Sequence, residues 1–211
     1  RISPRHLVYG RIIANLPKNP DWILHKLGYS KNLEEICVAG SPFFDSVYAG
    51  YQKPENPRKK ILFCLGNYYN HNQFYFGHNR PDSEISIWRA HKMIIEVLKK
   101  FQDVFEIYVK DYPDSPQKEI WLNLLRDQGG ENITYISGER PFAEILAEAD
   151  LHIFSWVSTT FFQSMYTDAD ICLYDNTDLT DEARLLFERD LVFESGLGQF
   201  CSRLEAYLTK G

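Results

Sequence analysis

The chain of 211 residues lacks several features that mark particular classes of protein. It has no apolar run near the length of about eighteen residues that a membrane-spanning helix requires, and we expect no signal peptide. Its formal net charge is -6 and its pI is about 5.5, which argues against a general basic surface for nucleic acid. We therefore expect a cytoplasmic protein that does not bind nucleic acid.

Sulfur-containing residues are scarce, since the chain has two methionines and four cysteines: Cys37, Cys64, Cys172 and Cys201. The first three cysteines fall inside predicted strands, and no two of the four stand at the spacing of metal ligands. We expect buried thiols in a reducing compartment and no metal site. Neither methionine is at position 1, and we expect the sequence to be a piece of a longer protein.

The chain does contain a regular alternation of apolar strands and amphipathic helices. Expected strands cover residues 59–66, 105–112, 132–137, 151–156 and 169–175, with a short strand within 34–47 and an edge strand at 190–195. Expected helices cover 83–101, 115–130, 140–149, 158–166, 180–188 and 198–209, with a short one that ends near residue 28. The composition, 44% hydrophobic and 25% charged, is ordinary for one large or two small globular domains.

The strand pattern predicts the fold class. Strands that are apolar throughout and alternate with helices indicate a parallel sheet covered on both faces. We predict an α/β fold, with a doubly wound, mainly parallel Rossmann-like sheet over residues 56–211. The polar, proline-containing stretch 51–60 predicts a domain boundary, and residues 1–55 are interpreted as the end of a truncated N-terminal domain with its linker.

Open parallel sheets bind ligands beyond the carboxyl ends of their strands, and one such end carries three consecutive hydroxyls. Ser158, Thr159 and Thr160 follow the predicted strand 151–156, where a helix begins. Unpaired amides, the positive end of the helix dipole and hydroxyl donors together suit a phosphate group. Ser158 could equally be a simple N-cap, and the sequence favours neither role over the other.

Two other strand ends carry charge. Lys110 ends the second strand of the domain and could meet a phosphate as a point charge, or it could be a solvated surface lysine. Gly138, Glu139 and Arg140 follow the third strand. Arg140 could bind a phosphate or a carboxylate, and the alternative is that it pairs with a neighbouring residue at the surface.

The loop over residues 66–82 is long for a connection between a strand and a helix. It is rich in aromatic residues and asparagine, which suits stacking on a ring and hydrogen bonding to the hydroxyls of a nucleotide or sugar. Gly66 and Asn67 begin it at the strand end. His71 and His78 lack cysteine or acidic partners at metal spacing, so a metal site is the weaker interpretation.

Several motifs occur in one order along the chain: "VAGSPFFDSV", "KKILFCLGN", "VKDYP" and "FAEILAEADLHIFSWVSTTFFQSM". In this order they resemble the C-terminal, donor-binding half of GT-B-type glycosyltransferases, and most of all bacterial capsule and other surface-polysaccharide transferases. The resemblance covers about residues 36–176. Sugar-nucleotide 2-epimerases share the architecture, but their Gly-Gly-x-Gln-Glu-Glu-like motif is absent.

The resemblance implies roles for particular residues. It implies that Ser158, Thr159 and Thr160 contact the donor phosphates, and that Gln163, where the family often has glutamate, contacts donor hydroxyls. Lys110 matches the lysine of a Lys-x-His-Pro motif, but Tyr112 replaces the histidine and supplies no imidazole. The candidate donor-binding residues are Gly66, Asn67, Lys110, Gly138, Glu139, Arg140, Ser158, Thr159, Thr160 and Gln163.

The function that the resemblance implies is transfer of a sugar, or of a polyol phosphate, from an activated nucleotide donor such as a nucleotide-sugar. The acceptor would be a glycan or a lipid-linked molecule in surface-polysaccharide synthesis. Such enzymes usually need neither a metal nor a cofactor, and peripheral membrane association through parts outside this sequence would fit. No catalytic residue can be named, because the general base of the family usually lies in the N-terminal domain. Two alternatives stay open: a non-catalytic nucleotide-sugar-binding module and a sugar-nucleotide epimerase.

Overall fold

The structure is a computed structural model that describes residues 5–8, 35–38, 52–65, 84–111, 118–137, 140–155, 158–174, 191–194 and 196–210. The chain divides into two compact units, residues 1–50 and 51–211. In the first unit, β1 (Arg5–Val8) pairs in parallel with β2 (Glu35–Val38). The sequence predicted a strand at the position of β2 but not β1.

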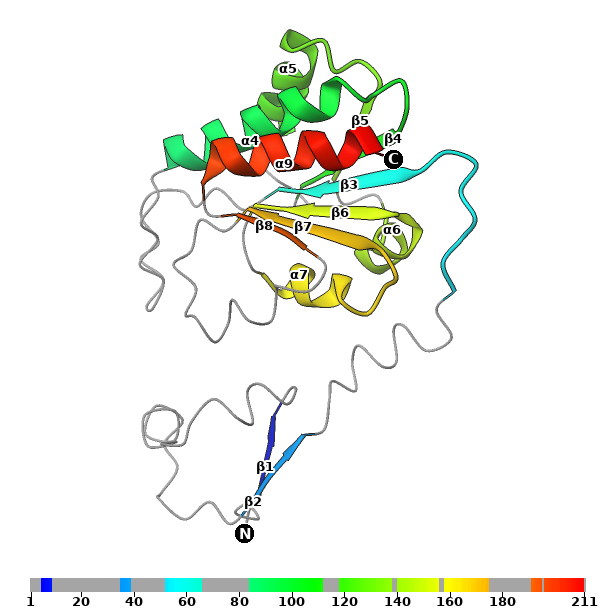
Figure 1. The fold of residues 1–211 in the computed structure, drawn as a ribbon, viewed down its shortest axis with the longest axis vertical. Coiled ribbons are helices and arrows are strands. Elements are labelled where there is room, and N and C mark those ends of the chain that lie inside the picture. The colour runs from blue at the N-terminus through cyan, green and yellow to red at the C-terminus, as the bar shows by residue number, and fades with distance from the viewer. Residues whose placement is uncertain are drawn as a thin grey trace. The chain divides into compact units, whose positions relative to one another are not determined.

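The second unit contains a six-stranded sheet in which all neighbouring strands are parallel (Figure 1). The strands are β3 (Lys60–Cys64), β4 (Glu106–Lys110), β5 (Ile133–Ile136), β6 (Leu151–Phe154), β7 (Asp170–Tyr174) and β8 (Leu191–Glu194). Their order in space is β5-β4-β3-β6-β7-β8. Each lies inside a predicted strand, so the prediction of a parallel sheet is confirmed.

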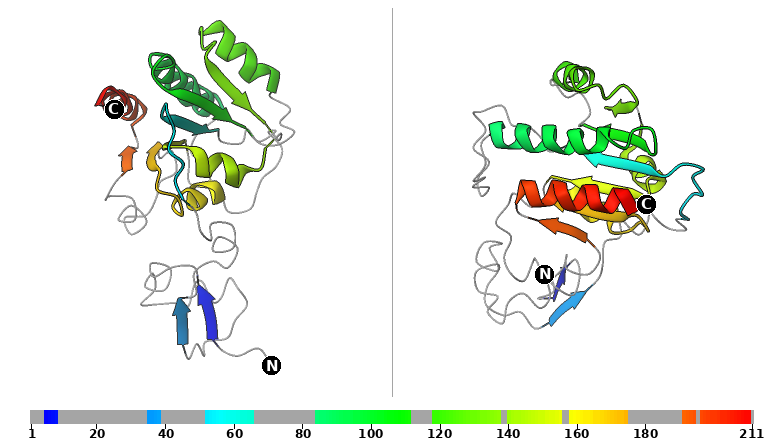
Figure 2. Two further views of the ribbon diagram at one scale, coloured as in Figure 1. Left: turned by 90° about the vertical axis from the view of Figure 1, so that its right-hand side faces the viewer. Right: turned by 45° about the horizontal axis from the view of Figure 1, so that its top comes forward.

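Helices cover both faces of the sheet (Figures 1 and 2). One face carries α4 (Glu84–Lys99), α5 (Lys118–Asp127) and α9 (Leu197–Lys210), and the other carries α6 (Phe142–Glu148) and α7 (Thr159–Ser164). Gly129, which follows α5, has a φ of 67°, a left-handed conformation that glycine adopts without strain at a helix end. The helices predicted near 180–188 and before residue 28 lie outside the described residues.

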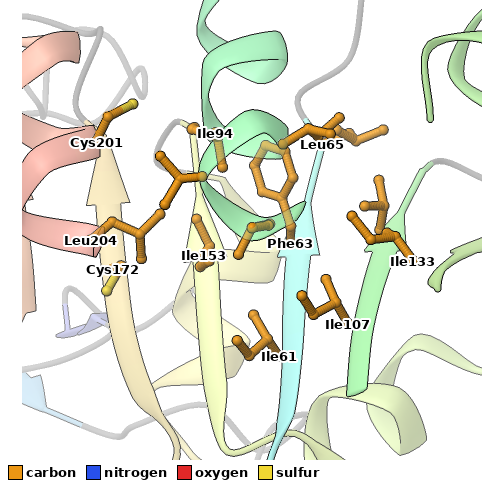
Figure 3. Packing of buried hydrophobic residues seen from close by; sticks show 14 of the residues in the cluster. Ile61, Phe63, Leu65, Ile94, Ile107, Ile133, Ile153, Cys172, Cys201 and Leu204 are labelled. Atoms are coloured by element: carbon orange, nitrogen blue, oxygen red, sulfur yellow. The ribbon is translucent and has the colours of Figure 1, made fainter. Parts of the chain in front are cut away.

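Alternating side chains of the strands form two apolar layers. On one face, Ile61 and Phe63 of β3 belong to a buried cluster with Ile94 of α4 (Figure 3). On the other face, Leu62 of the same strand belongs to a second cluster with Phe161 of α7. Because successive strand residues point to opposite faces, a strand that is apolar at every position needs helices on both sides. This requirement is why the sequence predicted a doubly wound fold correctly.

Polar contacts fasten the segment before β3 to the amino-end edge of the sheet. One carboxylate oxygen of Asp150 accepts hydrogen bonds from the Lys60 backbone N–H at 2.9 Å and from Asn56 Nδ2 at 3.0 Å. The other lies 3.2 Å from Lys53 Nζ. Burial opposes ionisation of Asp150, but these hydrogen bonds outweigh it and hold the pKa of the carboxyl below its usual value. Residues 53–60 are therefore anchored at the edge opposite the carboxyl ends of the strands.

Candidate functional site

The strand order defines where a ligand would bind. From β3 the chain proceeds through β4 and β5 on one side, and then through β6, β7 and β8 on the other side. Connections from β3 and β6 thus leave in opposite directions, which opens a crevice beyond their carboxyl ends. β3 and β6 are direct neighbours, with Cys64 paired to Phe154 at the last register position. The residues that follow these two strands therefore form the candidate site.

The segment after β6 presents hydroxyls at this edge. Ser158 has extended backbone angles and caps α7, since its Oγ accepts a hydrogen bond from the Phe161 N–H at 3.4 Å. Its Oγ also lies 2.6 Å from Thr160 Oγ1, and both side chains are half-buried. Phe161 is fully buried against Phe154, with ring centroids 5.4 Å apart, and fixes the start of α7 on the sheet. Ser158 is thus an N-cap. The predicted contact of Ser158 with a phosphate stays a prediction.

Lys110 lies at the same edge but inside the protein. Only 5% of it is exposed, so the alternative of a solvated surface lysine is wrong. Its Nζ donates to the backbone carbonyl oxygens of Asp111 and, at 2.6 Å, of Ser137, and so bridges the ends of β4 and β5. Burial raises the pKa of the neighbouring Cys64 thiol, and the charge of Lys110 offsets this only in part. A positive charge is therefore held beside the crevice by the protein's own carbonyls.

The guanidinium of Arg140 is directed elsewhere. It donates to both carboxylate oxygens of Glu148, one of them at 3.3 Å. Glu148 also lies 3.5 Å from Lys60 Nζ, at the amino end of β3. The hydrogen bond from Arg140 lowers the pKa of Glu148, which keeps the pair ionised. Of the two roles considered for Arg140, the structure shows the surface ion pair, and Arg140 is not among the donor contacts proposed below.

The remaining candidates are only partly described. Gln163 is half-buried on α7, three residues after Thr160, so these two residues lie on one side of the helix. The backbone of Thr159 begins α7. Four further candidates, together with His71 and His78, lie outside the described residues: Gly66, Asn67, Gly138 and Glu139.

Sequence reasoning missed a buried polar pair at the crevice. His91 of α4 is fully buried, and its Nε2 lies 2.7 Å from the Oγ of Ser155, the residue that follows β6. The imidazole packs edge-on against Phe63 at 5.4 Å and against Trp121 at 5.4 Å. The available signal was the position of His91 within the apolar face of a predicted helix. A buried polar side chain there requires a partner, but the sequence does not identify it.

Asp111 is a second polar residue whose role the sequence left undefined. It directly follows β4 and is 4% exposed. Its carboxylate accepts a hydrogen bond from the Tyr135 hydroxyl at 2.8 Å, across to β5. With the contact of Lys110 to Ser137, this bond holds the ends of β4 and β5 together. The edge beside the crevice is therefore stabilised by polar contacts.

Solved structures that are similar to this chain include glycosyltransferases. The pneumococcal O-GlcNAc transferase GtfA, determined in complex with UDP and GlcNAc, matches 98% of this chain and 38% of its own, with 12% identity and a TM-score of 0.53. The chain has a GT-B-like fold. A glycosyltransferase from Rickettsia africae matches 97% of this chain at 11% identity and a TM-score of 0.48, over 52% of its own length. The lipopolysaccharide glycosyltransferase WaaG matches 90%, at 13% identity and 0.47, again over 52% of its length.

This GT-B-like chain spans about 38% to 52% of the length of these structures. The low identities make the likeness one of fold. No family model and no curated protein sequence matches the chain. The fold agrees with the family resemblance that the motifs carry.

Polar groups lie at the carboxyl ends of the strands in this GT-B-like unit. The hydroxyls of Ser158 and Thr160 share one hydrogen bond, the ammonium of Lys110 donates to backbone carbonyls, and first-turn amides of α7 lie beside the two hydroxyls. Within the described ranges, no three or more His, Cys, Asp or Glu side chains gather where they could hold a metal ion. None of the helices in the part of the chain that the structure describes has the length and apolar character to cross a membrane.

Proposed function

We propose that the chain is the donor-binding part of a glycosyltransferase that takes a sugar from a nucleotide-sugar. The observation that carries the proposal is the position of Ser158 and Thr160. They stand after β6, at the point where the strand order of a GT-B-like sheet reverses. Two further facts support it: the motif order of the sequence, and a structure of the same fold that was determined with UDP and GlcNAc.

In this proposal the chain stabilises the departing nucleoside diphosphate. Breaking the bond between the sugar and the diphosphate leaves negative charge on the leaving group. Hydroxyls of Ser158 and Thr160 and the amides at the start of α7 donate hydrogen bonds to that charge. Lys110, held by the Ser137 carbonyl, contributes a positive potential nearby without being solvated. Gln163 is placed one turn along α7 to bind a sugar or ribose hydroxyl.

The finer features follow the family resemblance. We propose a metal-independent reaction without a cofactor, because the donor contacts named here supply positive charge and hydrogen-bond donors themselves. The acceptor would be a glycan or a lipid-linked glycan of the bacterial surface, modified in the cytoplasm with the help of parts outside this sequence. The first unit would be the end of an N-terminal domain that completes the enzyme and carries the general base.

A ligand screen of the full chain tests the proposal. Thermal unfolding is measured with CMP, CDP, UDP, GDP and their sugar conjugates. A ligand at about 100 times its Kd adds about 2.7 kcal/mol to the free energy of unfolding, which raises the Tm by about 5 to 10 °C. Thr160→Ala should abolish this rise. Thr167→Ala is the matched control, because Thr167 lies beyond the other end of α7, where its hydroxyl donates to Ser164 O at 2.7 Å.

The outcomes separate the candidate functions. Stabilisation by one nucleotide that Thr160→Ala removes and Thr167→Ala leaves supports the donor site. Binding without turnover by the longer protein favours a non-catalytic nucleotide-sugar-binding module, and conversion of the nucleotide-sugar without any acceptor favours an epimerase. No stabilisation by any of these nucleotides in the unaltered chain contradicts a donor site.

A further inference from the structure

The buried hydrogen bond between His91 and Ser155 joins two elements that flank the crevice. Ser155 is the first residue after β6 and is 2% exposed, and His91 lies in the middle of α4, the helix that follows β3 in the sequence. The two side chains are 64 residues apart in sequence and 2.7 Å apart at Nε2 and Oγ. This bond therefore crosses the point where the strand order reverses.

Both groups are fully enclosed, so neither can react with a substrate directly. The His91 ring is held on two sides by aromatic rings, those of Phe63 and Trp121. Trp121 itself packs against Trp88 at 5.2 Å. With so little freedom to move, the imidazole fixes the position of the Ser155 hydroxyl, and a buried hydrogen bond of this kind is costly to leave unmade. We therefore expect His91 and Ser155 to position the residues next to Ser155 in the chain.

What the pair positions is the start of α7, which follows β6 in the chain. Ser155 precedes Ser158 by three residues, and the hydroxyls of Ser158 and Thr160 lie 2.6 Å apart at the start of α7. We propose that His91, acting through Ser155, is a positioning residue that holds Ser158 and the start of α7 in the place that binds the donor diphosphate. The inference rests on the proposed function in that the bound group is a diphosphate, but the positioning itself is measurable without a ligand.

Four variants of the full chain test this inference. His91→Phe and Ser155→Ala remove the bond, whereas His91→Gln keeps a donor near the place of Nε2. His152→Phe is the matched control, since His152 is the other fully buried histidine of the described residues and bonds to Leu146 O at 3.0 Å, away from the crevice. Each variant is compared with the unaltered chain for UDP affinity by calorimetry and for amide hydrogen exchange by NMR.

The expected results distinguish positioning from simple loss of stability. His91→Phe and Ser155→Ala should raise the exchange rates of the Phe161 and Phe162 amides, which bond to Ser158, relative to amides of β4. They should also weaken UDP binding about tenfold or more. His91→Gln should stay within about threefold of the unaltered Kd, and His152→Phe should lower the Tm while leaving both readouts unchanged.

Two results would overturn the inference. One is unchanged exchange at Phe161 and Phe162 when the bond is removed. The other is an equal effect of His152→Phe on exchange and affinity, which would mean that general destabilisation explains the data. If the unaltered chain binds no UDP while exchange responds to His91→Phe, the positioning stands and the assignment of UDP as donor fails.

Discussion

Replacing His152 with glutamine is expected to reduce the chain's loss of stability between pH 6.5 and pH 4. His152 lies in β6 and is completely buried. Its Nε2–H donates to the Leu146 carbonyl at 3.0 Å, and its Nδ1 is buried without a hydrogen-bond partner among the described residues. Burial is the main reason that the pKa of His152 falls from 6.5 to about 4.

The sign and size of the effect follow from this lowered pKa. Below pH 6.5 the imidazole takes up a proton in the unfolded chain but stays neutral in the folded one, so acid favours the unfolded state. The contribution is fully present above pH 6.5 and is lost as the pH falls to about 4. At about 1.36 kcal/mol for each pH unit, the loss is about 3 kcal/mol. That is a substantial fraction of the 5 to 15 kcal/mol typical of a folded domain.

Urea unfolding at a series of pH values from 7.5 to 4.5 measures this effect. Glutamine can keep the donor to Leu146 O but does not titrate in this range. The free energy of unfolding should therefore fall less steeply with acid in His152→Gln than in the unaltered chain. Acidic groups with lowered pKa, such as Asp150 and Glu148, contribute to both proteins alike and cancel in the comparison. Equal slopes in the two proteins would refute the argument that His152 is buried in its neutral form.

Two further predictions concern the amino-end edge. Asp150→Ala should lower the free energy of unfolding by about 2 kcal/mol in urea denaturation, because it leaves the Lys60 N–H and the Asn56 amide without their shared acceptor. A loss of less than about 0.5 kcal/mol would show that residues 53–60 are not anchored there. Arg140→Gln should cost less than about 1 kcal/mol and leave nucleotide affinity unchanged, because the Glu148 pair is exposed. A marked loss of nucleotide affinity in calorimetry would show that Arg140 does contact the donor.

The sheet could be predicted from the sequence because its signal is local. Leu151–Phe154 is apolar except for His152 and is buried at every position, and such a strand has to be covered on both faces. The start of α7 was also predictable, since Ser158 is an N-cap residue placed before a helical segment. These features depend on the period of apolar side chains and on short-range capping, which one sequence contains in full.

Contacts between distant residues were not predictable in the same way. The sequence predicted that Lys110 and Arg140 follow or end strands. It did not predict that Lys110 is buried or that Arg140 forms an ion pair with Glu148. The bond from His91 to Ser155 joins residues of different elements, and nothing in either local pattern names the partner. Side-chain direction within a correctly placed element depends on packing, which only the assembled fold determines.

An NMR titration of the full chain with UDP tests the central claim most directly, because amide shifts show where a ligand binds. The account predicts saturable shifts that are largest at Ser155, Ser158 and Thr160, beyond the carboxyl end of β6. Small or absent shifts are predicted at Lys60 and Asp150, at the opposite edge. Shifts confined to the opposite edge, or no saturable shift with UDP or with the other nucleoside diphosphates, would contradict the claim that this crevice binds a nucleotide donor.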